Sequence, residues 1–315
     1  MGFFVFLPLI LPLTALPIAR LAEQHLHPRT GARLLTGLAA VLGLCSTLCL
    51  VLLGVVGTAQ IPGNPLPDAW ADPAVREVVP YDEAVGTVSI AALLAVTVSV
   101  AVAGWRHWRV ESGARRALAA VPGSGEVVVL PDDAPYAYAV PGRPGRIAVS
   151  TGMLACLEAG EQHALIAHER AHLRARHHRY LLLVRLAAAV NPFLRPLREA
   201  VSFGTERWAD EEAAQAVGDR RLTARAVGRA ALAGPSAVPV GLAGFAAPGP
   251  VPRRIAALLA PGPGPGLRGW PPAHSRTGVA ALVAAVGTTV SAVSSLNACL
   301  ALLLVLHVVP MNPLG

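Results

Sequence analysis

Four long stretches without a charged residue dominate the pattern of hydrophobic and polar positions along this chain. They run from Phe3 to Ala19, from Leu34 to Thr58, from Ala84 to Gly104 and from Gly278 to Val309. About 20 apolar residues carry a helix across the hydrocarbon core of a bilayer. The pattern therefore predicts four transmembrane helices. The first is the least regular because it contains Pro8, Pro12 and Pro17.

The first stretch has a second interpretation, a signal peptide that is removed. It lacks a basic segment in front of the apolar run, and Arg20 follows it directly. Signal peptides normally begin with positive charge, so we expect an uncleaved anchor.

The connecting loops differ in charge. Arginines gather between the first two stretches and after the third, whereas the loop between the second and third carries five acidic residues against Arg76 alone. Basic loops stay on the cytoplasmic side. We therefore expect a multi-pass protein of the plasma membrane, with both termini outside and the region between the third and fourth stretches in the cytoplasm.

That region has mixed patterns. Residues 106–126 look like a basic helix that leaves the membrane. Short strands are predicted from the β-rich runs, with a Pro/Gly turn before the last of them. They are Glu126 to Leu130, Tyr136 to Val140 and Ile147 to Ser150. A helix from Glu161 to Arg176 follows. Next comes an apolar helix from Tyr180 to Val190, which we expect to pack on its predecessor rather than touch the bilayer.

The predicted helix from Glu161 to Arg176 contains His168-Glu169-Arg170-Ala171-His172, an H-E-x-x-H pentapeptide. Residues four apart lie on one face of a helix. His168 and His172 can therefore bind one metal ion, and Glu169 can act as general base on a water molecule held there. This is the arrangement of zinc hydrolases. The less interesting alternative is a pair of ordinary surface histidines.

A catalytic zinc site usually takes three protein ligands. The best candidate for the third is Glu206, although a solvated helix charge is the alternative and other carboxylates compete for the role: Glu199, Glu211 and Glu212. Asp210 lies one turn beyond Glu206. It is placed to accept a hydrogen bond from a histidine ligand, as carboxylates commonly do around metal sites.

Several further segments resemble the membrane-bound gluzincin metallopeptidases, over about Ala134 to Leu259. They are Arg146 to Leu154, Ala164 to His172, Asn191-Pro192, Glu206 to Asp210 and Val251 to Leu258. The chain is most similar to family M56, which includes the protease part of BlaR/MecR-type β-lactam sensors. Family M48, with the HtpX and CAAX prenyl proteases, is a near second. Relatives often have Asp at the position of His177, so a supporting role for that carboxylate is not carried over.

The resemblance implies that His168, His172 and Glu206 bind one zinc ion per chain and that Glu169 is the base. The expected fold is mainly α, with four transmembrane helices and a small α+β gluzincin domain containing a short β-sheet. Its layout is a membrane region at residues 1–105, a cytoplasmic peptidase domain at 106–260, a Gly/Pro-rich linker at 261–277 and the last span at 278–309.

Composition narrows the function classes. Hydrophobic residues make up 54% of the chain and charged residues 14%, which fits a membrane protein. The net charge of +7 is explained by basic internal loops, and no nucleic-acid-binding module is recognisable. We therefore expect no nucleic-acid partner, and a soluble DNA-binding protein is a distant alternative. Cys45, Cys49, Cys156 and Cys299 form no C-x-x-C pair, which argues against a thiolate zinc site and a disulfide framework.

The sequence thus predicts a membrane zinc endopeptidase that cuts a protein or peptide substrate, with a repressor or sensor as a possible partner. A strand at Ile147 to Ser150 is expected to pair with the substrate backbone. Candidates for stabilising the oxyanion are Tyr180, Arg220 and Arg221, and His177 and His178 are expected to be a solvated basic cluster rather than extra ligands. The alternatives are an M48-type quality-control protease and a zinc-containing signalling or scaffold protein without turnover.

Overall fold

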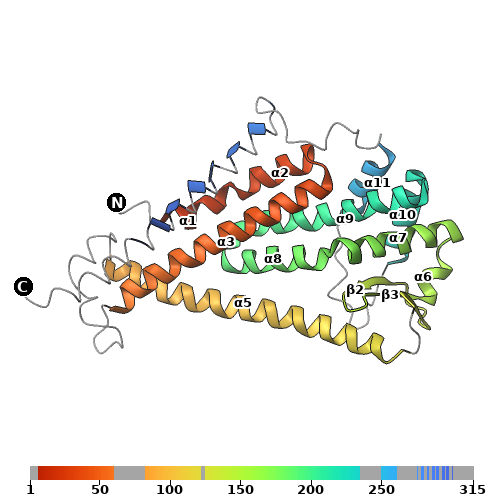
Figure 1. Ribbon diagram of the computed structural model, residues 1–315, viewed down its shortest axis with the longest axis horizontal. Helices are drawn as coiled ribbons and strands as arrows, with labels where there is room; N and C mark the ends of the chain where they lie inside the picture. Colours follow the sequence, from red (N-terminus) through yellow and green to blue (C-terminus); the bar gives the residue numbers. More distant parts are fainter. Residues whose placement is uncertain are drawn as a thin grey trace, which may run out of the picture.

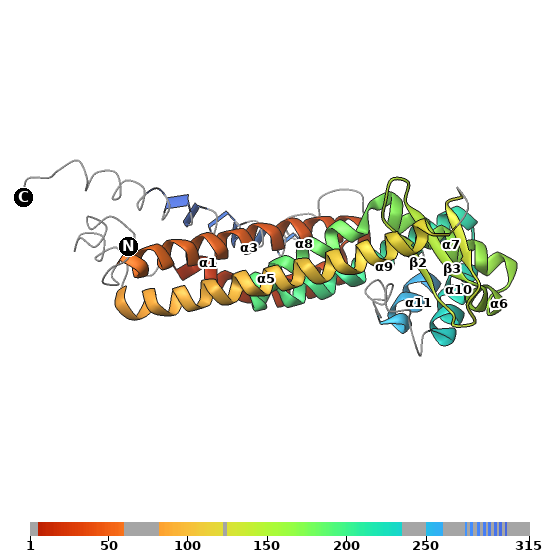
Figure 2. The ribbon, with the colours of Figure 1, turned by 90° about the horizontal axis from the view of Figure 1, so that it is seen from below.

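A computed structural model describes residues 6–59, 82–121, 125–234, 250–260 and scattered positions between 275 and 300. The molecule is elongated. Long helices α3, α5, α8 and α9 run side by side along its axis, and the small sheet gathers at one end with α6, α7, α10 and α11 (Figures 1 and 2). The predicted combination of a mainly helical chain and a small sheet is confirmed.

Two helices of the described part are long and apolar enough to cross a membrane, rather than the four predicted. They are α3 (Pro28–Ala59) and most of α5 (Asp82–Ala119). The first predicted span is wrong as a single helix: it is divided into α1 (Leu7–Ile10), the 3₁₀ helix η2 (Leu11–Thr14) and α2 (Ala15–His25). Pro8 and Pro12 lie in the first turns of α1 and η2, because proline is tolerated there and not inside a longer helix. The fourth predicted span lies largely outside the described residues.

Helix α5 does not stop where the membrane region was predicted to end. It continues without a break through Gly104 and the basic segment to Ala119. The predicted helix at 106–126 is therefore the last part of α5, and the expected boundary at residue 105 falls inside a continuous helix. The segment after Gly104 has no proline to interrupt it.

The three predicted strands form one sheet. They are β1 (Val127–Leu130), β2 (Ala137–Val140) and β3 (Arg146–Ser150). The order is β1-β3-β2, with β1 parallel to β3, Val127 opposite Ile147, and β2 antiparallel to β3, Ala137 opposite Val149. Strand β3 is thus in the middle and mostly buried. The expectation that Ile147 to Ser150 offers a free edge is wrong; β2 is the edge strand on that side.

Ser150 connects the sheet to the next helices. Its hydroxyl accepts a hydrogen bond from the backbone N–H of Met153 and begins α6 (Thr151–Ala155). Helix α7 (Ala159–Ala175) starts with a capping box between Glu158 and Glu161, which satisfies free backbone donors at both ends of the box. It ends at Arg176, whose φ of 55° lies in the left-handed region and redirects the chain.

Helix α8 (His177–Val190) packs mainly against α3 and α5, not against α7 as expected. The reason is its composition: Leu181 to Val190 is apolar apart from Arg185, so it buries best among the two apolar helices. A Cβ added to Gly43 of α3 would lie 3.3 Å from Cα of Ala187. The absence of a side chain at this position lets the two helices approach closely.

Asn191 ends α8 and fixes the turn into the next helices. Its Oδ1 accepts a hydrogen bond from the N–H of Phe193 at 3.1 Å, and its Nδ2 donates to Oγ of Ser46 at 3.2 Å. After the 3₁₀ helix η4 (Pro192–Leu194), α9 (Arg195–Val217) runs back beside α8 to α7. The buried apolar core of this bundle combines residues of α3, α8 and α9, among them Leu42, Val184 and Val201.

Helices α10 (Arg220–Ala233) and α11 (Val251–Leu259) pack against each other and against α9. The guanidinium of Arg220 binds the carboxylate of Glu211 and donates to the carbonyl oxygens of Ala257 and Leu258, at 2.9 and 3.0 Å. This holds the C-terminal end of α11 on α9 and positions the rest of α11 beside the predicted metal site.

Candidate metal centre

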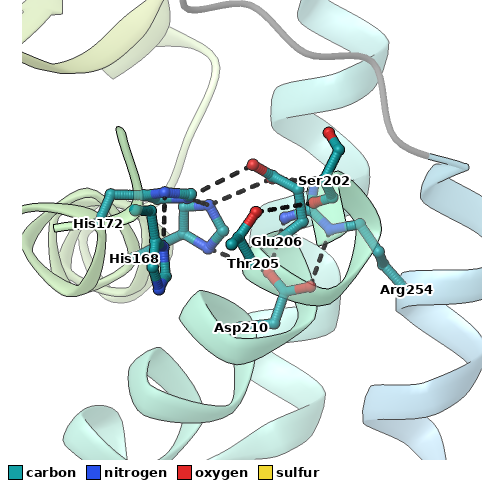
Figure 3. A network of polar contacts seen from close by, with 8 residues as sticks. His168, His172, Ser202, Thr205, Glu206, Asp210 and Arg254 are labelled. Atoms are coloured by element: carbon teal, nitrogen blue, oxygen red, sulfur yellow. Dashed lines mark hydrogen bonds and ion pairs between the residues drawn. The ribbon is translucent and has the colours of Figure 1, made fainter. Parts of the chain in front are cut away.

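Helices α7 and α9 bring the three predicted metal ligands together (Figure 3). Nε2 of His168 lies 3.1 Å from Nε2 of His172. The carboxylate oxygens of Glu206 lie 3.7 Å from Nε2 of His168 and 3.5 Å from Nε2 of His172. Within the described residues, these are the side chains that group as possible metal ligands, with all ligand atoms within 4.8 Å of one another.

These separations fit a zinc ion. Zinc binds nitrogen and carboxylate oxygen at about 2.1 Å and prefers a tetrahedron, so two of its ligands lie about 3.4 Å apart. The three separations of 3.1, 3.5 and 3.7 Å scatter around that value. Three donors on one side leave the fourth position for a water molecule. His168, His172 and Glu206 would therefore hold the ion with one open position.

Asp210 supports the first of these ligands. Its Oδ1 lies 3.0 Å from Nδ1 of His168, within ion-pair distance but without the geometry of a hydrogen bond. The carboxylate favours a proton on Nδ1, so the neutral ring would offer Nε2 to a metal. Such a contact fixes both the tautomer and the orientation of a ligand ring. Asp210 lies one turn from Glu206 in α9, which is the position expected from the sequence.

Arg254 of α11 compensates the two carboxylates. It donates to Asp210 through Nε at 2.8 Å and Nη2 at 2.7 Å, and its Nη1 lies 2.9 Å from Oε2 of Glu206. Only 8% of Arg254 is exposed. The sequence analysis included this residue in the segment Val251 to Leu258, which resembles the gluzincins, without assigning it a role. No local sequence pattern predicts the contact of Arg254 with these carboxylates, because it joins residues more than forty positions apart.

The charges of the site shift its pKa values. Burial favours the neutral form of Glu206, but His172, His168 and Arg254 outweigh it and hold the pKa of Glu206 well below its usual range. Burial also opposes charge on His168, yet Asp210 and Glu206 raise its pKa to about 10. A cation is therefore strongly favoured at the centre of the cluster, and a metal ion would have to displace a proton from His168.

Glu169 has a different environment. Burial raises its pKa to about 7, against the lowering effect of His168, and the backbone of Ala139 in β2 donates a hydrogen bond to it. A carboxyl group whose pKa lies near neutrality can both accept and deliver a proton. Edge strand β2 and the H-E-x-x-H helix are thus joined at the residue that the sequence identified as the base.

His177 is not part of a solvated basic cluster, and this expectation was wrong. Only 1% of it is exposed. Its Nδ1 lies 2.9 Å from Nδ1 of His172, and its ring centroid is 4.7 Å from that of Trp208. If Nε2 of His172 faces a metal, its Nδ1–H donates to His177. His177 therefore takes the place beside the second ligand that Asp210 takes beside the first.

The structure does not bring the three oxyanion candidates to the site. Tyr180 stacks edge-on with Trp208 at 6.1 Å, Arg220 anchors α11, and Arg221 begins α10 with its backbone N–H on Asp219. None of them lines the cavity beside the cluster. The competing carboxylates are also accounted for: Glu211 binds Arg220, Glu212 accepts from Trp208 at 2.6 Å, and Glu199 lines the cavity but is not part of the group of possible metal ligands.

A cavity of about 1050 Å³ adjoins the cluster. Its lining includes residues 137–139 of β2 and, from α7, His168, Glu169 and His172. Residues of α5, α8, α9, α10 and α11 line it as well. It is large enough for several residues of an extended peptide.

Residues 101–196 match the family model of peptidase family M48. The matched stretch runs from the end of the apolar part of α5 to the start of α9 and includes the H-E-x-x-H motif, but it stops before Glu206. Over this stretch the chain is similar to the M48 peptidases, which favours a metallopeptidase. The finer resemblance to M56 receives no support from this match. No curated protein and no solved structure matches the chain significantly.

Replacing Arg254 with Gln is expected to destabilise the metal-free protein by about 3 kcal/mol, because it leaves buried Asp210 and half-buried Glu206 with protonated His168 as their remaining counter-charge. Added zinc should reduce the loss, since the ion compensates Glu206. Thermal and denaturant unfolding in detergent measure both effects. The matched control is Arg253→Gln, because Arg253 is exposed and its partner Glu23, 2.8 Å away, is half-buried; it should cost about 1 kcal/mol or less. Equal losses for both variants would contradict the role of Arg254.

Replacing His177 with Phe keeps a buried ring but removes the acceptor for His172. Zinc affinity is expected to fall by about 10–100-fold, the usual effect of losing a residue that orients a metal ligand. His177→Asp supplies another acceptor and should retain the affinity. Competition with a chromophoric chelator measures it. His178→Phe, one residue along α8, is the control. An unchanged zinc affinity in His177→Phe would show that His172 is oriented by other means.

Proposed function

We propose that this protein is a membrane-bound, zinc-dependent endopeptidase. The observation that carries the proposal is the convergence of His168, His172 and Glu206 on one point, with Glu169 beside them on the cavity wall. The match to peptidase family M48 supports the same reaction class. One zinc ion per chain would be held by these three side chains.

Zinc, when bound, supplies a Lewis acid that lowers the pKa of a water molecule and polarises the scissile carbonyl. The protein's own residues do the rest. Glu169 accepts the proton of the attacking water and delivers it to the leaving amine nitrogen. Asp210 and His177 hold the rings of His168 and His172 in place. Arg254 keeps the carboxylates of Glu206 and Asp210 charged inside the protein.

Strand β2 is proposed to hold the substrate. It is the edge strand next to α7, and Ala137, Tyr138 and Ala139 line the cavity. An extended peptide that pairs with such an edge gains main-chain hydrogen bonds and lies in a fixed register. This pairing would place a peptide bond of the substrate across Glu169, which Ala139 already contacts.

The proposed location is the plasma membrane, with the catalytic end in the cytoplasm. Helices α3 and α5 have the length and apolarity to span a bilayer, and the arginine-rich loops favour the cytoplasmic side for the catalytic end. A membrane protein or a membrane-associated regulator, such as a repressor or sensor, is the proposed substrate. Quality control of membrane proteins, as in M48-type proteases, fits the family match better than the M56-like cleavage of a repressor.

Replacing Glu169 with Gln is expected to lower the rate of cleavage by about 10²–10⁴-fold or more while zinc stays bound, because the base is lost and the ligands remain. The membrane proteomes of a deletion strain and of a strain carrying this variant should both accumulate the uncut substrate. Metal analysis of the purified variant checks the zinc. Glu199→Gln, which changes another carboxylate of the cavity wall, is the control. Full activity of Glu169→Gln would exclude the proposed base, and zinc binding without any cleavage by the wild type would favour a signalling role.

The acid side of the pH–rate profile should report Glu169. Its pKa of about 7 is raised by burial, and a bound dication would favour the carboxylate, so the midpoint is expected between about pH 5 and 7. As the pH falls through the midpoint, the base is protonated and kcat/KM should fall about tenfold per unit. The zinc content is measured at each pH to separate this effect from loss of metal. A flat profile between about pH 5 and 8, at constant zinc content, would contradict the assignment.

A further inference from the structure

The end of the apolar part of α5 carries the residues typical of a membrane–water interface. Trp105 and Trp108 follow Gly104 and are 53% and 63% exposed. The guanidinium of Arg109 lies 5.2 Å from the ring centroid of Trp105. Tryptophan and arginine gather at the headgroup level of membrane proteins. Given the proposed membrane location, this turn of α5 marks the inner boundary of the bilayer.

The hairpin of α8 and α9 lies beside the start of the apolar part of α3, and close contacts at two glycines fix its position along α3. A Cβ at Gly43 would lie 3.3 Å from Ala187 of α8 and 3.8 Å from the side chain of Leu194. A Cβ at Gly204 of α9 would lie 3.6 Å from that of Ala32. The part of the hairpin between these contacts therefore runs along residues 32–43 of α3, where the chain passes from Arg33 into its apolar stretch.

Two arginines of this part face the cavity, Arg185 from α8 and Arg198 from α9. His107, which lies between the two interfacial tryptophans of α5, lines the same cavity. Arg198 is close enough for its charge to act on Arg185. Among the residues that the structure describes, no carboxylate forms an ion pair with either arginine. Glu199 lines this cavity as well but is not within pairing distance of them, and Glu23 is paired with Arg253.

Both arginines are exposed, and neighbouring positive charges without a paired carboxylate favour the binding of an anion. Arginine matches phosphate especially well, because its planar group makes two parallel hydrogen bonds. Apolar side chains lie next to the arginines on the same wall of the cavity, at helical spacing: Leu181 and Leu182. A phosphate group at the interface next to an apolar wall is what a phospholipid presents.

We infer that Arg185 and Arg198 form a binding site for the headgroup phosphate of an anionic phospholipid of the inner leaflet. Basic pockets between membrane helices on the cytoplasmic side bind such headgroups. Arg198 lies eight residues before Glu206 in α9, about 12 Å along the helix axis. The lipid therefore occupies the membrane-side end of the cavity, and the catalytic residues occupy the other end. By holding the hairpin at the interface, it would fix the distance of Glu206 from the bilayer.

This inference rests on the membrane location in the proposed function but not on catalysis, so its test uses binding. The full chain is reconstituted in nanodiscs of equal parts phosphatidylglycerol and phosphatidylcholine. It is then released into detergent, and retained lipid is counted by native mass spectrometry. The wild type should keep one phosphatidylglycerol in preference to phosphatidylcholine. Each arginine near an anionic headgroup contributes about fivefold, so Arg185→Gln/Arg198→Gln together should lose about thirtyfold of this preference.

Arg195→Gln is the matched control, since Arg195 lies on the same hairpin, is exposed and does not line the cavity; its preference should be unchanged. Unchanged zinc content shows that the double variant is folded, and the pair Arg185→Lys/Arg198→Lys should keep part of the preference. Equal retention of phosphatidylglycerol by the wild type and the Gln double variant would overturn the inference. Failure of this inference can be distinguished from failure of the proposed function. Glu169→Gln should retain the lipid although it does not cleave. Recovery of the chain in a soluble form without detergent would instead contradict the proposed membrane location.

Discussion

The site depends on the burial of two carboxylates against one guanidinium. Glu206 and Asp210 lie on one face of α9, and Arg254 reaches both from α11. Two acidic groups inside a protein repel each other and resist losing their water, so without a cation they would take up protons or move apart. With Arg254 in place, Asp210 stays charged and orients His168. Glu206 also stays charged and faces both histidines.

This requirement explains why helices far apart in the sequence converge on α9. Arg220 fastens the C-terminal end of α11 by binding Glu211 and two carbonyl oxygens, and so places Arg254 one turn away from that anchor. The position of α9 itself is fixed by the buried core that it shares with α3 and α8. The long helices therefore pack together with the end of the molecule that holds the candidate site. The packing of the apolar bundle determines the position of Glu206, the third predicted ligand.

His172, the second predicted ligand, has a neutral neighbour where His168 has a carboxylate. His172 is oriented by His177, a neutral ring that is almost completely buried against Trp208. Burial lowers the pKa of His177 to about 2, so this ring accepts a hydrogen bond and brings no positive charge next to the metal site. Above Trp208, Arg29 and Arg33 from the start of α3 lie 5.3 Å from its ring centroid. The stack thus connects the N-terminal end of α3 to His172, one of the three predicted metal ligands.

Local sequence determined much of this protein. Helical spacing placed His168 and His172 on one face with Glu169 beside them, the runs of β-rich residues predicted the three strands, and uncharged stretches predicted α3 and the apolar half of α5. Asp210 could be predicted because it lies one turn from Glu206. These features follow from the periodicity of apolar and polar residues, which can be read from residues that are close together in the sequence. Only the tertiary structure decided the order of the strands, which made β2 rather than β3 the edge. It also decided the packing of α8 on α3 and α5, and the roles of Arg254 and His177. Each of these results from which surfaces bury one another across long separations in the chain, and a buried contact of that kind leaves no pattern among adjacent residues.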